Sequence, residues 1–218
     1  LAQIFDYSAR HPPNLMGTLA AGTSEPYASG SVQAHGFLAN HAGLAKARCV
    51  GNIGYQPDSD GVLRRTPVRT YFEGKNYPHL ATALLACGQK DPSATFMPGK
   101  ARGLWRVPYS RALSTYTVIS AVEILNESAP QDLLAGRYVL VGSSALGLGD
   151  RVSTPLTPLG SGVMVHAASL TGLLDLEAGL LNAPWSGRNW LLAWCVLSVA
   201  LAVFWLSRLA ASWAGSVS

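Results

Sequence analysis

Charged residues are scarce in this sequence. Asp, Glu, Lys and Arg make up 13% of its 218 residues, against about a quarter in soluble globular domains. Apolar types make up 49%, so part of the chain is expected to avoid water. No stretch interleaves basic with aromatic side chains as a base-stacking surface does, and the densest basic group is only Arg64, Arg65 and Arg69. Nucleic acid is therefore not an expected partner.

Cysteine is also rare, and its spacing argues against a metal site. Cys49, Cys87 and Cys195 contain no CxxC pair and have no clustered histidines, so no structural zinc or other metal is expected, and no cofactor. Cys49 and Cys87 can form a disulfide only in an oxidising compartment. The sequence leaves that pairing open but favours buried free thiols for both residues.

The chain lacks a recognisable leader. It starts at Leu1 rather than at methionine, and no basic stretch followed by an apolar run resembles a signal peptide. We therefore expect the natural start to lie upstream of Leu1. Internal repeats and low-complexity tracts are missing as well, which argues against solenoid and array folds.

One long uncharged run is present near the end. Residues 189–207 read NWLLAWCVLSVALAVFWLS, with Arg188 and Arg208 on either side. As a helix this run rises about 28 Å, close to the hydrocarbon thickness of a bilayer, whereas buried core helices are usually shorter and less uniformly apolar. Tryptophans near both ends suit the two interfaces. The sequence thus predicts a transmembrane helix over 186–208, with 209–218 as the start of a candidate second span.

Residues 1–185 carry all twelve acidic residues and are expected to form an α/β domain with a mixed sheet and flanking helices. Within them, 1–33 is interpreted as loop with one short strand and 34–47 as a short helix. Two strand-like runs, 49–55 and 62–72, predict a β-hairpin around the turn Pro-Asp-Ser-Asp-Gly. Further strands are predicted at 103–109 and 137–142, and helices at 77–87, 118–127 and 162–181, the last with an apolar stripe of Val163, Ala167, Leu170 and Leu174.

A glycine-rich loop follows the strand predicted at 137–142 and resembles three catalytic or binding motifs. A P-loop needs Gly-Lys-Ser/Thr, but here Asp150 follows the last glycine. A dinucleotide-binding loop opens directly into a helix, whereas Pro155 and Pro158 delay the helix. A nucleophile elbow around Ser144 would need a glycine where Leu146 stands. The loop is therefore interpreted as a strand-to-helix connection, with the sharp backbone geometry provided by Gly142, Gly147 and Gly149.

Few side chains are candidates for ligand binding. Arg64 and Arg65 could receive an anion, although pairing with nearby carboxylates is favoured. Asp150, Thr154 and His166 follow a predicted strand, where ligands often bind in α/β sheets, but bracing roles are favoured for the first two and a structural role for His166. The loop residues Asp58, Asp60 and Gly61 are interpreted as a turn rather than a calcium loop, because Pro67 occupies the closing glutamate position. No catalytic residue is assigned.

Five stretches, in the same order, resemble one known family. They are VGNIGYQPDSDGVLRRTPV, YPHLATALLA, WRVPYS, VISAVEIL and LAGRYVLVGSSALGLGDRVSTPLTPLGSGVMVHAASLTGLL. Over residues 48–176 the chain is similar to the CHASE-two domain, an extracellular sensory module of bacterial receptors. The resemblance implies a domain that lacks the family's early N-terminal portion. It also implies that membrane helices, commonly three, and then a cytoplasmic output domain follow, such as an adenylate or guanylate cyclase, a diguanylate cyclase or a kinase.

The resemblance further implies a location and partners. Residues 1–185 are expected on the periplasmic side of a bacterial cytoplasmic membrane and Arg208 inside, with residues 173–188 coupling the domain to the membrane helix. Expected partners are the bilayer, an unidentified small-molecule or peptide stimulus, and a second copy joined through the membrane helices. The chain itself is not expected to be an enzyme. Two alternatives stay open: a membrane-anchored serine hydrolase using Ser143 or Ser144 with His166 and Asp150, and a binding module that does not switch.

Overall fold

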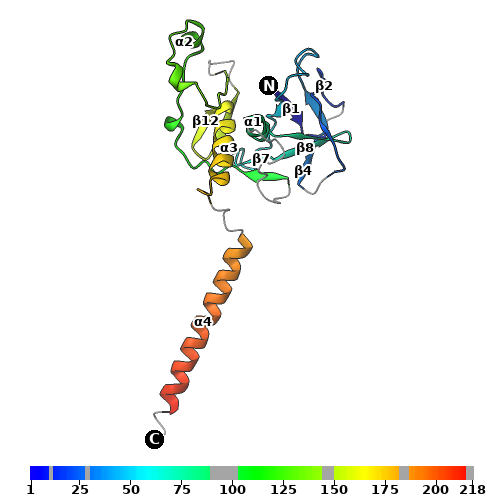
Figure 1. Ribbon diagram of the computed structural model, residues 1–218. Coiled ribbons are helices and arrows are strands. Elements are labelled where there is room, and N and C mark those ends of the chain that lie inside the picture. The colour runs from blue at the N-terminus through cyan, green and yellow to red at the C-terminus, as the bar shows by residue number, and fades with distance from the viewer. Residues whose placement is uncertain (10–11, 28–29, 89–102, 144–149, 182–186, 215–218) are drawn as a thin grey trace. The chain divides into compact units, whose positions relative to one another are not determined.

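The computed structural model describes residues 1–9, 12–27, 30–88, 103–143, 150–181 and 187–214. The chain separates into two compact units, Leu1–Leu181 and Asn182–Ser218. The first contains sheets and helices, which confirms the predicted mixed α/β class, and the second contains the long helix α4 (Gly187–Ala214) (Figure 1).

Two four-stranded sheets form the β-rich part of the first unit (Figure 1). In one, the strand order is β2 (Leu15–Met16), β5 (Gly36–Leu38), β1 (Ala2–Asp6) and β6 (Gly51–Asn52), and β1–β5 is its antiparallel pair. In the other, the order is β3 (Thr23–Ser24), β9 (Lys75–Pro78), β8 (Arg69–Phe72) and β4 (Ser31–Gln33), and β4 runs parallel to β8. Both sheets therefore mix parallel and antiparallel pairs.

The first 47 residues differ from the sequence-based prediction. Residues 1–33 contain four strands rather than one, and the helix predicted at 34–47 is wrong, because this segment holds β5 followed by turns. Strand β5 pairs with a strand on each side, and the ring of Phe37 packs edge-on against Phe72 at 5.5 Å between centroids. These long-range pairings override the helix-like apolar spacing.

The hairpin predicted around Asp58–Gly61 is correct as a turn and wrong as a strand pair. Strand β6 pairs with β1, while β7 (Arg65–Pro67) pairs antiparallel with β10 (Leu104–Arg106). The turn itself closes through the Asp58 amide, which donates to the Val62 carbonyl at 3.1 Å. Gly61 has φ +77°, a value that favours glycine. The strand predicted at 103–109 is confirmed as β10.

Helices α1 (Leu80–Gly88) and α3 (Gly162–Glu177) pack against each other, and both confirm predicted helices. Their shared core consists of Ala81, Leu85, Leu170 and Leu173. Figure 1 shows α3 between β12 and α1. Strands β11 (Arg151–Thr154) and β12 (Thr157–Ser161) form an antiparallel pair that contacts α3. The predicted stripe is only partly correct, because Leu170 is buried whereas Val163, Ala167 and Leu174 are half-buried. The buried positions Val165, Ala168 and Leu173 lie outside it, because α3 is covered on more than one side.

The segment between β10 and β11 is mostly exposed. It contains the short helices η2 (Leu113–Thr115), α2 (Ala121–Leu125) and η3 (Gln131–Leu133), of which α2 confirms the helix predicted at 118–127. The buried strand predicted at 137–142 is wrong: these residues form no strand, and Val139 and Val141 are 53% and 91% exposed. A strand forms only where a partner lies beside it, and the described residues provide none here.

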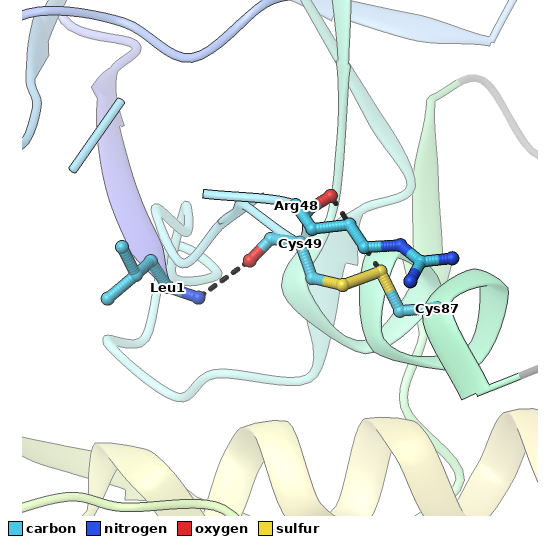
Figure 2. The surroundings of a disulfide bond; sticks show 4 residues. All are labelled: Leu1, Arg48, Cys49 and Cys87. Atoms are coloured by element: carbon cyan, nitrogen blue, oxygen red, sulfur yellow. Dashed lines mark hydrogen bonds between the residues drawn. A yellow bond between two sulfur atoms is a disulfide. The ribbon is translucent and has the colours of Figure 1, made fainter. Parts of the chain in front are cut away.

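Cys49 and Cys87 are joined in a disulfide, with 6.2 Å between their Cα atoms (Figure 2). The sequence favoured free thiols, so that interpretation is wrong. Cys87 lies in the last turn of α1, and Cys49 lies just before β6. Gly51 of β6 packs closely against the first residue of α1, because a Cβ on Gly51 would overlap the Cα of Leu80. The disulfide thus fixes the far end of a helix whose near end already packs on β6.

Helix α4 has 28 residues and contains the apolar run. Over Asn189–Arg208 it is long and apolar enough to cross a membrane, with a mean hydropathy of 2.1, and none of that stretch is buried. Two hydroxyls in the run donate to carbonyls of the same helix, Ser198 to Trp194 and Ser207 to Phe204, both at 2.7 Å. Cys195 is free and exposed.

Candidate functional site

The two candidate arginines are already paired. Both guanidinium nitrogens of Arg64 donate to Asp60, at 2.9 and 2.8 Å, and one also donates to Asp58 at 3.0 Å. Arg65 donates to the other oxygen of Asp58 at 3.1 and 2.6 Å. The hydrogen bonds from Arg64 lower the pKa of Asp60 to about 2. Both arginines therefore brace the turn, which is the carboxylate pairing that the sequence favoured.

Asp150 lies at the start of α3. Its carbonyl accepts from the Gly162 amide at 2.8 Å, and its carboxylate is so close to Gly162 that a Cβ there would overlap it. The same carboxylate accepts from the Tyr55 hydroxyl at 3.4 Å. A carboxylate at a helix N-terminus is stabilised by the helix dipole, so Asp150 acts as a brace. Burial, together with the charge of Asp150, raises the pKa of Tyr55.

Thr154 closes the turn between β11 and β12. Its hydroxyl oxygen accepts from the amides of Leu156 and Thr157, at 3.3 and 3.2 Å, and the hydroxyl donates to the Thr157 carbonyl at 3.3 Å. These are the local side-chain hydrogen bonds of a Ser/Thr turn. Thr154 thus has the bracing geometry that the sequence favoured.

Gly142 is needed for close packing. A Cβ on Gly142 would lie 2.6 Å from the Cβ of Val163 in α3. Gly147 and Gly149, the two other loop glycines, lie outside the described residues, as does Ser144 of the hydrolase alternative. The carbonyl of Ser143 accepts from the Ser161 hydroxyl at 3.4 Å. In the part of the chain that the structure describes, Arg64, Asp150 and Thr154 form their hydrogen bonds with other residues rather than with one another.

His166 does meet an ionisable partner, and that partner is His79. Their ring centroids are 5.4 Å apart with the planes tilted by 39°. His79 lies between β9 and α1, where its Nδ1 accepts from the Ala81 amide at 3.3 Å, and His166 lies in the second turn of α3. The side chains are 2% and 8% exposed. Two titratable rings thus occupy the interface between α1 and α3.

Each ring of this histidine pair keeps one nitrogen without a partner. Nε2 of His79 and Nδ1 of His166 are buried and make no hydrogen bond to any described residue. Because Nδ1 of His79 accepts a hydrogen bond, the neutral ring carries its proton on Nε2, which leaves a buried donor unpaired. A buried group in that state costs about 1–3 kcal/mol. Such atoms are rare in folded proteins, and here two lie in one place.

Burial determines the charge state of the histidine pair. It lowers the pKa of His79 to about 3, with a further contribution from the neighbouring His166, and the pKa of His166 to about 4. Both rings are therefore neutral near pH 7, and protonating either would place a charge in an apolar interface. Among the described residues, no group of three or more His, Cys, Asp or Glu side chains is arranged to hold a metal ion.

Asn52, which lies beside His79, has a hydrogen-bond partner for each of its side-chain polar atoms. It bridges to His79 through the backbone and is fully buried. Its oxygen accepts from the amides of Phe5 and Gly54, at 3.2 and 2.7 Å, and its nitrogen donates to Thr70 at 2.8 Å and to the Tyr7 hydroxyl. Desolvation raises the pKa of Tyr7 to about 12. This network is satisfied at every atom, so the unpaired nitrogens next to it are not a general feature of the core.

The sequence-based prediction found His166 but missed His79 and Asn52. A signal was available, because all three lie in the family-like stretches VGNIGY, YPHLATALLA and GVMVHAA. What the sequence did not provide was their proximity, which depends on the packing of α1 against α3.

Comparison with known families extends the resemblance. The model of the CHASE2 domain family matches residues 1–205. The chain belongs to the CHASE2 domain family. CHASE2 domains are extracellular sensory domains, and the match continues through the first 47 residues and into α4, beyond the stretch 48–176 that carries the motifs. No curated protein and no solved structure matches the chain.

Proposed function

We propose that this CHASE2 chain is the extracytoplasmic input domain of a bacterial membrane receptor. In this proposal residues 1–181 lie in the periplasm or outside the cell, α4 crosses the cytoplasmic membrane, and a stimulus bound by the folded unit changes a cytoplasmic output domain. The exposed apolar α4 supports the membrane part, since its length and mean hydropathy suit a bilayer.

The disulfide between Cys49 and Cys87 is the main observation in favour of an extracytoplasmic location. Structural disulfides persist in oxidising compartments and are rare in the bacterial cytosol. Cys49 and Cys87 lie in the folded unit, whereas the third cysteine, Cys195, lies in α4 and is free. This distribution supports a folded unit that matures outside the cytoplasm.

Coupling would run through residues 173–188, which connect the core of α3 to α4. Asp175 in this segment is buried and paired with Arg111 at 2.8 Å, and its carbonyl accepts from the Leu180 amide at 2.7 Å. The end of α3 is therefore anchored to the folded unit, so a displacement of α3 would be transmitted along the chain. A stimulus can shift such an equilibrium only if it prefers one arrangement.

A fusion tests the proposal. A cytoplasmic reporter enzyme whose activity depends on dimerisation is attached after Ser218, and its activity in cells is compared with and without residues 1–181. The expected result is a changed reporter activity at equal amounts of membrane-bound protein. Unchanged activity would contradict the sensory function and favour a module that binds without switching. Cleavage of a simple ester by the chain, lost on Ser144→Ala, would instead favour the hydrolase alternative.

A further inference from the structure

The interface between α1 and α3 contains the rings of His79 and His166, and Nε2 of His79 and Nδ1 of His166 have no hydrogen-bond partner among the described residues. The elements packed around this interface carry the charged side chains Lys75, Arg106, Arg111, Asp150, Arg151, Asp175 and Glu177. Three of these have partners elsewhere, since Asp150 accepts from Tyr55 and Asp175 pairs with Arg111. A proton carried on either unpaired nitrogen therefore finds no hydrogen-bond partner among the described residues unless water enters.

The tautomer of His79 excludes a simple metal role and indicates a proton role. Its Nδ1 accepts from the Ala81 amide, so Nε2 is protonated and cannot bind a metal while the ring is neutral. The unpaired Nε2 of His79 is thus a donor, and the centroid of its ring lies 5.4 Å from that of His166, whose Nδ1 is also unpaired. Such a pair responds to pH, because histidine is the side chain whose ordinary pKa lies nearest neutrality.

We propose that His79 and His166 form an acid-operated latch between α1 and α3: the two helices stay packed through their apolar core while both rings are neutral, and they separate when the extracytoplasmic space is acidified. The latch itself is a property of the folded unit. Its use in signalling rests on the proposed sensory function, for which it would make external acidity a stimulus.

The direction of the effect follows from the charge states. Burial keeps the pKa of both rings in the closed arrangement far below 6.5, so the closed arrangement binds fewer protons than the open one. Its stability is complete above about pH 6.5 and falls as the pH drops towards about 4. Each ring that protonates on opening changes the equilibrium about tenfold per pH unit, and two rings change it about a hundredfold.

His166 is the ring expected to reach water first. It is 8% exposed, against 2% for His79, and it lies on α3, the last helix before α4 in the sequence. His79 is held more firmly, because its amide donates to the Val68 carbonyl at 3.1 Å and its Nδ1 accepts from Ala81. Opening is therefore expected to move α3 away while the start of α1 stays on β6.

Hydrogen exchange of the 218-residue chain in lipid nanodiscs tests the latch. Protection of amides, corrected for the intrinsic pH dependence of exchange, is compared between pH 7.5 and 4.5. We expect protection in α1 and α3 to fall tenfold to a hundredfold per pH unit below 6.5, while β8 and β9 keep theirs. Constant protection in α1 and α3 would overturn the proposal, and so would an equal fall in β8 and β9, which would mean general acid unfolding.

Variants assign the effect to the two rings. The double variant His79→Asn/His166→Asn keeps a polar group at each site, including an acceptor near Ala81, but cannot titrate. Its protection is expected to be independent of pH in this range, whereas the matched control His35→Asn, at an exposed histidine, keeps the wild-type slope. A double variant that keeps the wild-type slope would overturn the proposal.

If the double variant does not fold, histidine ring signals in the wild-type chain test whether protonation of the two rings accompanies the opening of α3. In protein labelled with ¹³C at histidine, two ring signals are expected to stay neutral until the protection of α3 is lost and then to change with it. Protonation of those rings while α3 stays protected would overturn the latch.

The fused reporter separates the latch from the proposed function. If both hold, reporter activity follows external pH in the wild-type chain and ignores it in the double variant. A reporter that depends on residues 1–181 but ignores pH would refute the signalling role of the latch and leave the sensory function standing. A reporter that ignores deletion of residues 1–181 would refute the sensory function, whatever the exchange experiment shows.

Discussion

Helices α3 and α4 are both rich in apolar residues, yet their environments are opposite. Nine of the 16 residues of α3 are buried, including the polar His166, Ser169 and Asp175. In α4, none of the stretch Asn189–Arg208 is buried. A helix that is apolar all round is stable only inside a protein core or in a membrane. For α3 the protein provides that environment, and for α4 we infer that the bilayer does.

The polar groups of the two helices support the same contrast. Asp175 of α3 finds its partner on another segment, in Arg111. In α4 the hydroxyls of Ser198 and Ser207 bond back to carbonyls of their own helix. A spanning helix must satisfy its polar groups internally, because lipid offers no partners. Three experiments on the two helices and on the cysteines of the two units test this contrast, and a fourth tests the packing of α3 alone.

The largest effect is expected from charge in the middle of α4. The double variant Leu197→Arg/Leu201→Arg costs about 2.5–3.5 kcal/mol per residue at the bilayer centre, so the chain is expected to leave the membrane fraction while residues 1–181 stay folded. The matched variant Leu173→Arg in α3 is expected to unfold the first unit but leave the chain in the membrane. Sedimentation of membranes, with limited proteolysis, measures both. Full membrane retention of the α4 variant would contradict the inference that α4 lies in the bilayer.

The next effect concerns the cysteines of the two units. Breaking the Cys49–Cys87 bond with Cys87→Ser is expected to lower the free energy of unfolding by about 4 kcal/mol, from the entropy of a loop with a sequence separation of 38. Cys195→Ser in α4 should leave it unchanged. Denaturant titration measures the difference. Alkylation of the unfolded, unreduced chain at all three cysteines would contradict the disulfide.

Truncation of matched leucines gives a smaller effect. Leu173→Ala is expected to destabilise the first unit by about 2–5 kcal/mol, because Leu173 is 1% exposed and its removal leaves a cavity between α1 and α3. Leu197 in α4 is 51% exposed, so Leu197→Ala should change the stability of the first unit by less than about 0.5 kcal/mol. Equal losses would mean that α4 also belongs to the protein core.

The smallest effect is expected at a close approach on α3. A Cβ on Gly172 would lie 2.7 Å from Pro108 and 2.9 Å from the Trp105 ring. Gly172→Ala is therefore expected to cost about 1–3 kcal/mol through overpacking, less whatever alanine adds to helix stability. Thermal unfolding measures the change. A stabilised Gly172→Ala variant would show that the segment around Pro108 is free to move.

Local signals in the sequence were sufficient for the helices. Residues 77–87, 162–181 and 189–207 have the apolar spacing or length that a helix needs, and a helix lies in each range. The ends differ, because residues 77–78 belong to β9 and α3 ends at Glu177. The turn at Asp58–Gly61 was also predictable, because Asp and Gly at these positions form the turn through local hydrogen bonds and a positive φ.

Strands and sites depended on contacts that the sequence does not reveal. The run at 137–142 has strong strand character but no partner, whereas 36–38 has little and becomes a strand between two others. The candidate site residues Arg64, Arg65 and Thr154 are local braces, as their neighbours in sequence suggested. Asp150 is a brace through distant partners, because it accepts from Tyr55 and Gly162. The pairing of His166 with His79 arises from the packing of α3 on α1, so no local pattern could predict it.

Cysteine labelling in intact cells shows on which side of the membrane the folded unit lies. In a Cys195→Ser background, Ser59→Cys places a thiol in the exposed turn beside Asp60, and Ser216→Cys places one beyond Arg208. A membrane-impermeant maleimide is expected to label Ser59→Cys before lysis and Ser216→Cys only after it. Labelling of Ser59→Cys only after lysis would contradict an extracytoplasmic folded unit anchored by α4.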